Sequence, residues 1–327
     1  MRAISFPQYA IALIAGAFLG LAPCSAPAQS YPGKPIRLIL GFPPGGGVDI
    51  VARQIAPMLS ERLGQQVVID NRAGAAGNIA LEMLAKAPPD GYSLMLVTPS
   101  IAVNPALYRK LPFDPVHDFA PVTLVATSAL ILAVHPSLPA KSVTQLIALA
   151  KARPHQLSYS SGGNGSAAHL AYELFKGMTG VDIVHVPYKG IAPALIALLA
   201  GEVQLTFGTL PSTLPHVRTG KLRALAVTSP KRSTFLPDMP SVSEAGVPGY
   251  ESAQWYGALL PAGTPPAIVA RLNREFTAVV EMADVKTRLS SEGLETTTST
   301  PEQFAAFIKS ELAKWGKVVK ESGMRID

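Results

Sequence analysis

Phe42-Pro43-Pro44-Gly45-Gly46-Gly47-Val48-Asp49 is a glycine-rich turn that lies between two patterned segments. The apolar run 36–40 before it is typical of a buried strand, and residues 50–63 after it have helical periodicity. Such a turn leaves backbone N–H groups unpaired at the positive end of a helix dipole. It can therefore hold an anion without a charged side chain.

A second turn of the same kind is Ser160-Ser161-Gly162-Gly163-Asn164-Gly165-Ser166. It follows a predicted strand at 157–160 and precedes a predicted helix at 166–178, for which Ser166 is a suitable N-cap. If both turns face one cleft, a ligand between them would meet two helix N-termini. We interpret the pair as ligand-binding elements, although each turn alone could simply close a strand–helix connection.

Strand and helix patterns alternate in two series, which predicts an α/β fold with two doubly wound lobes. Lobe one is expected at residues 31–126 plus 255–327, and lobe two at 127–254. Two successive strands at 122–126 and 129–134 interrupt the alternation. Chain crossings near 125–130 and 254–259 would form a hinge between the lobes. The other strands are expected at 66–69, 93–97, 183–186, 203–207, 222–227 and 254–260, and the helices at 77–86, 142–151, 191–199, 211–219, from 264 through Val279, and from 300 through Trp315.

The N-terminus reads as a signal peptide. Arg2 precedes the apolar segment 10–22, and Ala26-Pro27-Ala28 predicts cleavage after Ala28. A lipid-modified Cys24 is the less favoured alternative. Cys24 is the single cysteine, so the mature protein would have no disulfide and no thiol nucleophile. We expect an exported, periplasmic protein.

The composition limits the partners. The formal net charge is +6 over 327 residues, and no run of basic residues suggests nucleic acid. The histidines lack metal-ligand spacing. We expect no cofactor, no metal and a monomer.

Enzyme interpretations rest on few residues. Residues 163–168 match the pattern G-x-G-x-x-A, but Asp182 lies before the next strand rather than after it. An exported hydrolase using Ser161 or Ser166, with His169 as its base, is the alternative from another class. Asp49 either stabilises its helix through the dipole, orients the loop, or receives an amino group or a water.

The chain resembles the Bug-type substrate-binding proteins of tripartite tricarboxylate transporters over essentially its whole mature length. The resemblance implies a two-lobed receptor of the Venus-flytrap type (type II periplasmic-binding-protein fold) without catalysis. Such a receptor delivers a small carboxylate to membrane permease subunits, or presents it to a sensor domain. The motifs that carry the resemblance are Tyr31-Pro32-Gly33-Lys34-Pro35-Ile36-Arg37, Phe42-Pro43-Pro44-Gly45-Gly46, Asp70-Asn71-Arg72, 85–92 (AKAPPDGY), 186–190 (VPYKG) and 221–227 (KLRALAV).

The resemblance also implies which residues contact the ligand. Many members have an Asp where Gly208 and Thr209 stand here, which argues against an amino-acid ligand and for a mono- or dicarboxylate. By motif, the resemblance carries ligand contacts over to Pro44, Gly45, Gly46, Thr98, Ser161, Asn164, Gly165 and Ser166. We also expect Phe42, Asp49, His169, Phe207 and Gly208 among the ligand-binding residues.

Overall fold

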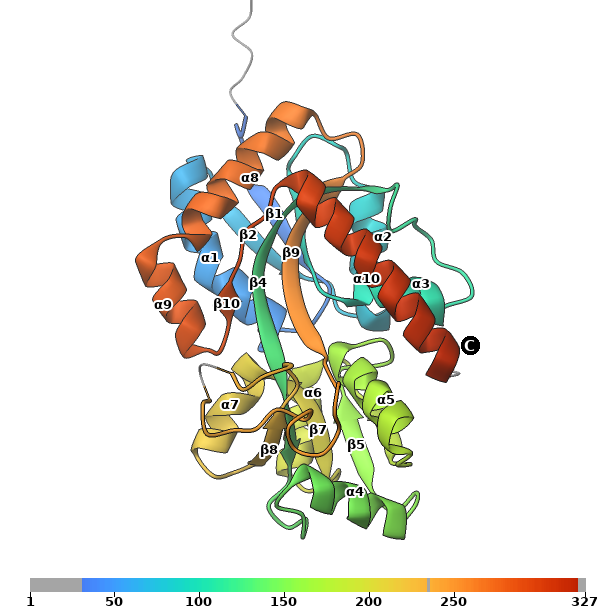
Figure 1. Ribbon diagram of the computed structural model, residues 1–327. Coiled ribbons are helices and arrows are strands. Elements are labelled where there is room, and N and C mark those ends of the chain that lie inside the picture. The colour runs from blue at the N-terminus through green and yellow to red at the C-terminus, as the bar shows by residue number, and fades with distance from the viewer. Residues whose placement is uncertain (1–30, 234–235, 323–327) are drawn as a thin grey trace, which may run out of the picture.

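The computed structural model describes residues 31–233 and 236–322, which form two α/β lobes joined by strands that run from one lobe into the other (Figure 1). The predicted cleavage after Ala28 and the alternative lipidation of Cys24 lie outside the described residues. None of the described helices combines the length and apolar character that a membrane span requires.

Lobe one is built on a sheet with the strand order β2-β1-β3-β9-β4. The first three strands are parallel, and β9 runs antiparallel to both of its neighbours. Alternate side chains of β1 and β3 enter different cores, so both faces of the sheet need a helical cover. The strands are β1 (Ile36–Leu40), β2 (Val67–Asn71), β3 (Ser93–Val97), β4 (Phe119–Val134) and β9 (Ala253–Pro261).

Helices α1, α8 and α9 cover one face of this sheet, and α2, α3 and α10 cover the other. Sequence patterns predicted neither α3, whose apolar run contains Pro105, nor α9, which buries only Val285 and Leu289. The helices are α1 (Gly47–Leu63), η1 (Ala75–Gly77), α2 (Asn78–Ala85), α3 (Ser100–Leu107), α8 (Pro266–Val280), α9 (Ala283–Ser291) and α10 (Pro301–Ser322), and the short strand β10 is Glu295–Thr296.

Lobe two has the same layered design. Its sheet contains β5–β8 and the C-terminal end of β4, with α4 and α5 packed on one face and α6 and α7 on the other. The elements are α4 (Val143–Ala152), β5 (Ser158–Ser161), α5 (Ala167–Thr179), β6 (Val184–Pro187), α6 (Ile191–Leu199), β7 (Leu205–Thr209), α7 (Leu210–Arg218) and β8 (Arg223–Val227).

Strand β4 belongs to both lobes. Residues 119–129 pair with β9, and residues 130–134 pair with β7 and β8. The prediction of two separate strands at 122–126 and 129–134 was therefore wrong. Thr127 and Ser128 interrupt the apolar pattern, but both keep their ladder partners on β9, and the Ser128 hydroxyl donates to the Gly293 carbonyl. The two predicted crossings thus lie side by side as one paired ribbon.

One carboxylate fastens the C-terminal helix to this ribbon. Glu311 of α10 accepts hydrogen bonds from the indole nitrogens of Trp255 (3.0 Å) and Trp315 (3.1 Å), and both indoles are buried. Trp315 is thereby a core residue, as its helical spacing predicted.

Replacing this carboxylate should destabilise lobe one. Glu311→Ala leaves two buried indole donors unsatisfied, so we expect the free energy of unfolding to fall by roughly 2–4 kcal/mol. Glu311→Gln, which keeps one acceptor oxygen, should lose less. Urea denaturation of both variants measures the difference, and equal losses would contradict the role of the acceptor.

Candidate functional site

The loop before α1 ends in amides without protein partners. Gly47 is the first helical residue, and neither its N–H nor that of Val48 is hydrogen-bonded to any described residue. The first regular bond of the helix runs from the Ile50 N–H to the Gly46 carbonyl. These amides form a donor cup at the positive end of the α1 dipole.

A side chain of α1 holds this loop in place. Gly45 has a left-handed backbone (φ 82°), and its N–H donates to Asp49 Oδ2 at 3.0 Å. The same carboxylate accepts from Arg53 Nε (2.8 Å) and Asn71 Nδ2 (3.2 Å). Asn71 also donates to the Phe42 carbonyl, so β2 supports the loop as well. Asp49 therefore orients the loop.

The electrostatics of Asp49 agree with this role. Burial tends to raise the pKa of the Asp49 carboxyl, but hydrogen bonds from Arg53, Gly45 and Asn71 outweigh it and lower the pKa overall. The carboxylate is thus ionised at neutral pH and fully engaged within lobe one.

The loop before α5 repeats this design with different chemistry. Gly165 is also left-handed (φ 79°), also lies two residues before its helix, and also donates its N–H to a side chain four residues later. The acceptor is His169 Nδ1, at 3.0 Å. Ser166 caps α5 by accepting from the His169 N–H. The amides of Ala167 and Ala168 have no hydrogen-bond partner among the described residues.

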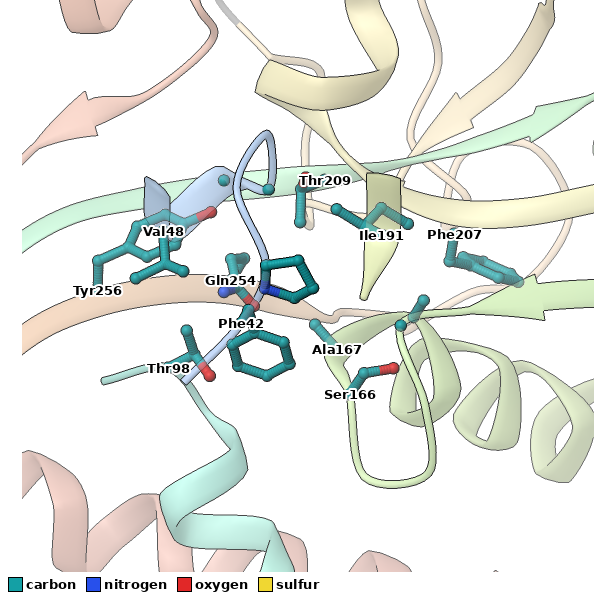
Figure 2. A pocket seen from close by; sticks show the side chains of 15 residues that line it. Phe42, Val48, Thr98, Ser166, Ala167, Ile191, Phe207, Thr209, Gln254 and Tyr256 are labelled. Carbon is teal, nitrogen blue, oxygen red and sulfur yellow. The ribbon is translucent and has the colours of Figure 1, made fainter. Parts of the chain in front are cut away.

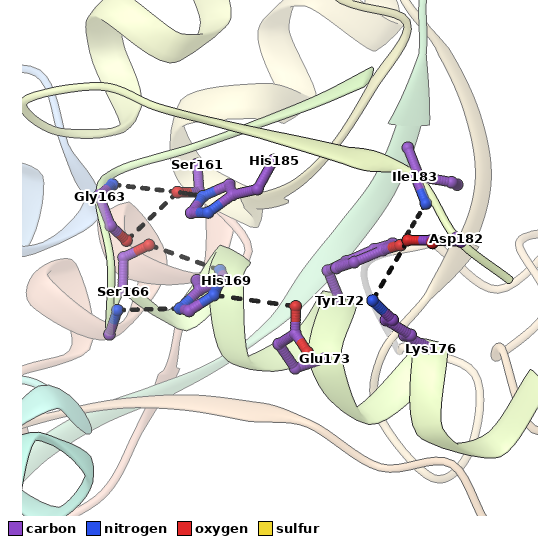
Figure 3. A network of polar contacts seen from close by, with 11 residues as sticks. Ser161, Gly163, Ser166, His169, Tyr172, Glu173, Lys176, Asp182, Ile183 and His185 are labelled. Atoms are coloured by element: carbon purple, nitrogen blue, oxygen red, sulfur yellow. Dashed lines mark hydrogen bonds and ion pairs between the residues drawn. The ribbon is translucent and has the colours of Figure 1, made fainter. Parts of the chain in front are cut away.

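His169 is the first ring of a buried stack (Figure 3). Its ring lies 4.5 Å from that of His185, which in turn stacks on Tyr159. Burial lowers the pKa of His169 to about 4 and that of His185 to about 3. His169 is therefore neutral at pH 7, with Nδ1 free to accept and its proton on Nε2, 3.8 Å from Glu173 Oε1.

A cavity lies between the two cups, with walls from both lobes (Figure 2). The start of α6 at Ile191 and the residue before α7, Thr209, complete it. None of the described residues that line it carries a charge, so helix-terminal amides and neutral side chains provide its polarity. The lining residues are Phe42, Pro43, Gly46, Gly47, Val48, Thr98, Gly162, Ser166, Ala167, Ala168, Ile191, Phe207, Thr209, Gln254 and Tyr256.

The structure places the predicted site residues in three groups. Asn164 lines another cavity, which shares Phe42, Pro43 and Gly162 with the first. Outside the linings of both cavities are Pro44 and Gly45, which are exposed, and Asp49, Ser161, Gly165, His169 and Gly208. The first cavity is lined by Phe42, Gly46, Thr98, Ser166 and Phe207.

Sequence reasoning missed the β9 contribution to the cavity. Gln254 and Tyr256 line its wall, while Trp255 between them points into the opposite core. The period-two alternation of a strand was the available signal. It gave no indication that this face of β9 would border the cleft.

The lobes touch each other at several points around the cavity. The Ser212 hydroxyl donates to the Gly45 carbonyl at 3.1 Å, and a Cβ at Gly190 would lie 2.6 Å from Pro43 Cδ. A Cβ at Gly165 would lie 2.5 Å from Asn104 Oδ1. Leu170 of α5 packs with Trp315 and residues of α3. The structure is thus a closed form.

This geometry defines a two-lobed solute-binding protein whose cleft is suited to an anion. The sequence matches the tripartite tricarboxylate transporter family receptor model over residues 51–324. It is 39% identical to protein BugT of Bordetella pertussis over 317 residues, covering 96% of this chain and 97% of that protein. The chain belongs to this receptor family, which confirms the resemblance found in the sequence.

Solved structures agree in fold. R. palustris Rpa4515, solved with adipate, is 43% identical and superposes with a TM-score of 0.88, covering 90% of this chain and all of that chain. MatC (Rpa3494) from Rhodopseudomonas palustris, solved with malate, is 32% identical with a TM-score of 0.84, covering 88% of this chain and all of that one. The periplasmic binding protein BugD is 32% identical with a TM-score of 0.87, covering 90% of this chain and all of that one, which confirms the predicted periplasmic-binding-protein fold.

The neutral state of His169 makes stability depend on pH. The unfolded chain binds a proton at His169 below about pH 6.5, whereas the folded protein does so only below about pH 4. The free energy of unfolding should therefore fall as the pH decreases through this window. His169→Asn keeps an acceptor for Gly165 without a titrating ring. Its free energy of unfolding should therefore change less with pH, by up to about 1.4 kcal/mol per pH unit. Urea denaturation from pH 7 to 4 measures this, and parallel slopes would contradict it.

Gly165 should be required for closure. In Gly165→Ala the new methyl group meets Asn104 across the cleft, so we expect a larger radius of gyration by small-angle X-ray scattering. Gly180→Ala is the matched control, because Gly180 has a similar φ of 69° but open space around its Cβ. An unchanged radius in Gly165→Ala, or an equal increase in both variants, would contradict this steric role.

Proposed function

We propose that this protein is a periplasmic receptor that closes on a small carboxylate between its lobes and delivers it to a tripartite tricarboxylate-type permease. The observation that carries this proposal is the uncharged cavity bordered by the free amides of α1 and α5. Family membership and the relatives solved with adipate and malate support it.

A carboxylate suits this cavity better than a cation or a neutral solute. Two helix N-termini provide donors for it, and no described acidic side chain in the lining opposes it. Asp49, in the first turn of α1, is already held by Arg53, Asn71 and the Gly45 amide. The absence of an acidic residue in the lining also disfavours an amino group on the ligand.

Closure would follow from the layout of the chain. We propose that residues 31–126 plus 255–327 move as one lobe and residues 127–254 as the other, by bending of the β4–β9 ribbon. A carboxylate that bridges both cups stabilises only the closed form, in which Gly45 and Ser212 are also bonded. We expect the loaded, closed monomer to be the form that a permease recognises.

One contact between a serine and a histidine is consistent with the hydrolase alternative. Ser161 Oγ lies 2.6 Å from His185 Nε2, a distance suited to a nucleophile and its base. Ser161 is fully buried, however, and does not line the cavity. A His185 pKa of about 3 makes its imidazole a poor base at neutral pH. We therefore assign the pair to supporting the second loop and propose that the protein is not an enzyme; ester turnover lost in Ser161→Ala would reverse this assignment.

Binding is tested by calorimetry and thermal shift with mono-, di- and tricarboxylates, including adipate and malate. Ala167→Leu projects a larger side chain into the cavity from the first turn of α5, so we expect its affinity to be at least tenfold weaker. Ala148→Leu, at an exposed position of α4, is the matched control and should bind normally.

The outcomes are distinct. If no carboxylate raises the melting temperature of the wild-type protein, the proposed ligand class is wrong. If carboxylates bind equally well to wild type and Ala167→Leu, they bind elsewhere than in this cavity.

A further inference from the structure

The cavity has a polar spot that the carboxylate cups do not use. Five polar side chains line it, and three of them have protein partners. Thr98 bonds to Ser100, Thr209 to Ser212, and Ser166 caps α5. The hydroxyl of Tyr256 and Oε1 of Gln254 are buried without any hydrogen-bond partner.

These two side chains form one unit. They stand two residues apart on β9, so they project from the same face of the strand. Tyr256 is fully buried and Gln254 is 4% exposed. Burial raises the pKa of Tyr256, and the neighbouring Gln254 amide opposes part of this shift. The phenol is therefore protonated at neutral pH and able to donate.

The position of Tyr256 relates the unit to the carboxylate. Its hydroxyl occupies the space that a side chain at Gly47 would fill, directly beside the first turn of α1 (Figure 2). An anion on the α1 amides would therefore also lie within reach of the Tyr256 hydroxyl. Gln254, on the same face of β9 and also in the lining, would then lie beside the atoms next to that carboxylate.

The amide of Gln254 limits what those atoms can be. It offers an acceptor and donors on one planar group, and its Oε1 is buried without a partner, which costs free energy unless a ligand donates to it. A second carboxylate satisfies only the donors, and a methylene satisfies nothing. A hydroxyl group accepts from the amide nitrogen and donates to the amide oxygen, so it pairs with both.

We propose that Gln254 and Tyr256 select carboxylates with a hydroxyl group on the carbon next to the bound carboxylate. This inference rests on the proposed function and names the ligand class of the same cavity. The Tyr256 hydroxyl donates to the carboxylate, and the Gln254 amide forms hydrogen bonds with the 2-hydroxyl group. Because Gln254 lies on one wall only, the two enantiomers of a 2-hydroxy acid should bind with different affinities.

The test uses calorimetry with matched sets of three ligands at three chain lengths: succinate with each enantiomer of malate, glutarate with each enantiomer of 2-hydroxyglutarate, and adipate with each enantiomer of 2-hydroxyadipate. At the best-binding length, one enantiomer should bind at least about tenfold more tightly than the unsubstituted acid. Gln254→Met, similar in size but without the amide, should reduce both this ratio and the enantiomer preference to within about twofold.

Two further variants locate the effect. Tyr256→Phe should weaken all three members of a set by a similar factor, because it removes a donor to their shared carboxylate. Gln156→Met makes the same exchange at an exposed position and should leave every affinity as in the wild type.

The failure of this inference differs from failure of the proposed function. If all these acids bind the wild type but hydroxylated and unsubstituted members bind alike, the hydroxyl inference is wrong. If Gln254→Met still prefers the hydroxylated ligands, another residue recognises the hydroxyl group, and the inference is also wrong. If no member of any set binds, and no other carboxylate does, the receptor proposal itself fails.

Discussion

The site depends on how each lobe fixes one left-handed glycine. Gly45 and Gly165 both donate their amides to a side chain four residues ahead, Asp49 in one lobe and His169 in the other. This bond turns each loop so that the next amides, at the start of α1 and α5, are left without partners. An ionised carboxylate and a neutral imidazole thus hold the two loops in the same way, by accepting from the glycine amide. The equivalence is geometric, and a comparison of residue types would not reveal it.

The fold supports these loops from two directions. The first loop follows β1, whose alternate side chains enter two separate cores, and the second follows β5, which is anchored in the lobe-two core by Tyr159. The β4–β9 ribbon then sets the two cups facing each other across one cavity. Because β4 is continuous and pairs in both lobes, the lobes share a strand instead of being connected only by loops. Contacts such as Ser212 with Gly45 complete the closed form.

Local sequence patterns predicted much of this arrangement. Residues 36–40, 93–97 and 191–199 were assigned with the observed bounds, because apolar runs between turn residues are local signals. The polar pair Thr127-Ser128 misled the assignment of β4, since its pairing with β9 comes from residues far along the chain. For the same reason, the sequence did not place Gln254 and Tyr256 in the site, because the loops that border the cavity lie far from them along the chain. Asp49, one of the predicted ligand-binding residues, lies outside the lining and holds the first loop in place through the Gly45 amide.

The proposed recognition through main-chain amides has an evolutionary consequence. A substitution in the two loops, other than to proline, keeps the N–H groups at the start of α1 and α5. The surrounding wall, from Ile191, Phe207 and Gln254, is made of side chains and can be exchanged one at a time. A duplicated gene could therefore acquire a new preferred solute through a few substitutions in the cavity wall. The main-chain donors for the ligand carboxylate would be unchanged.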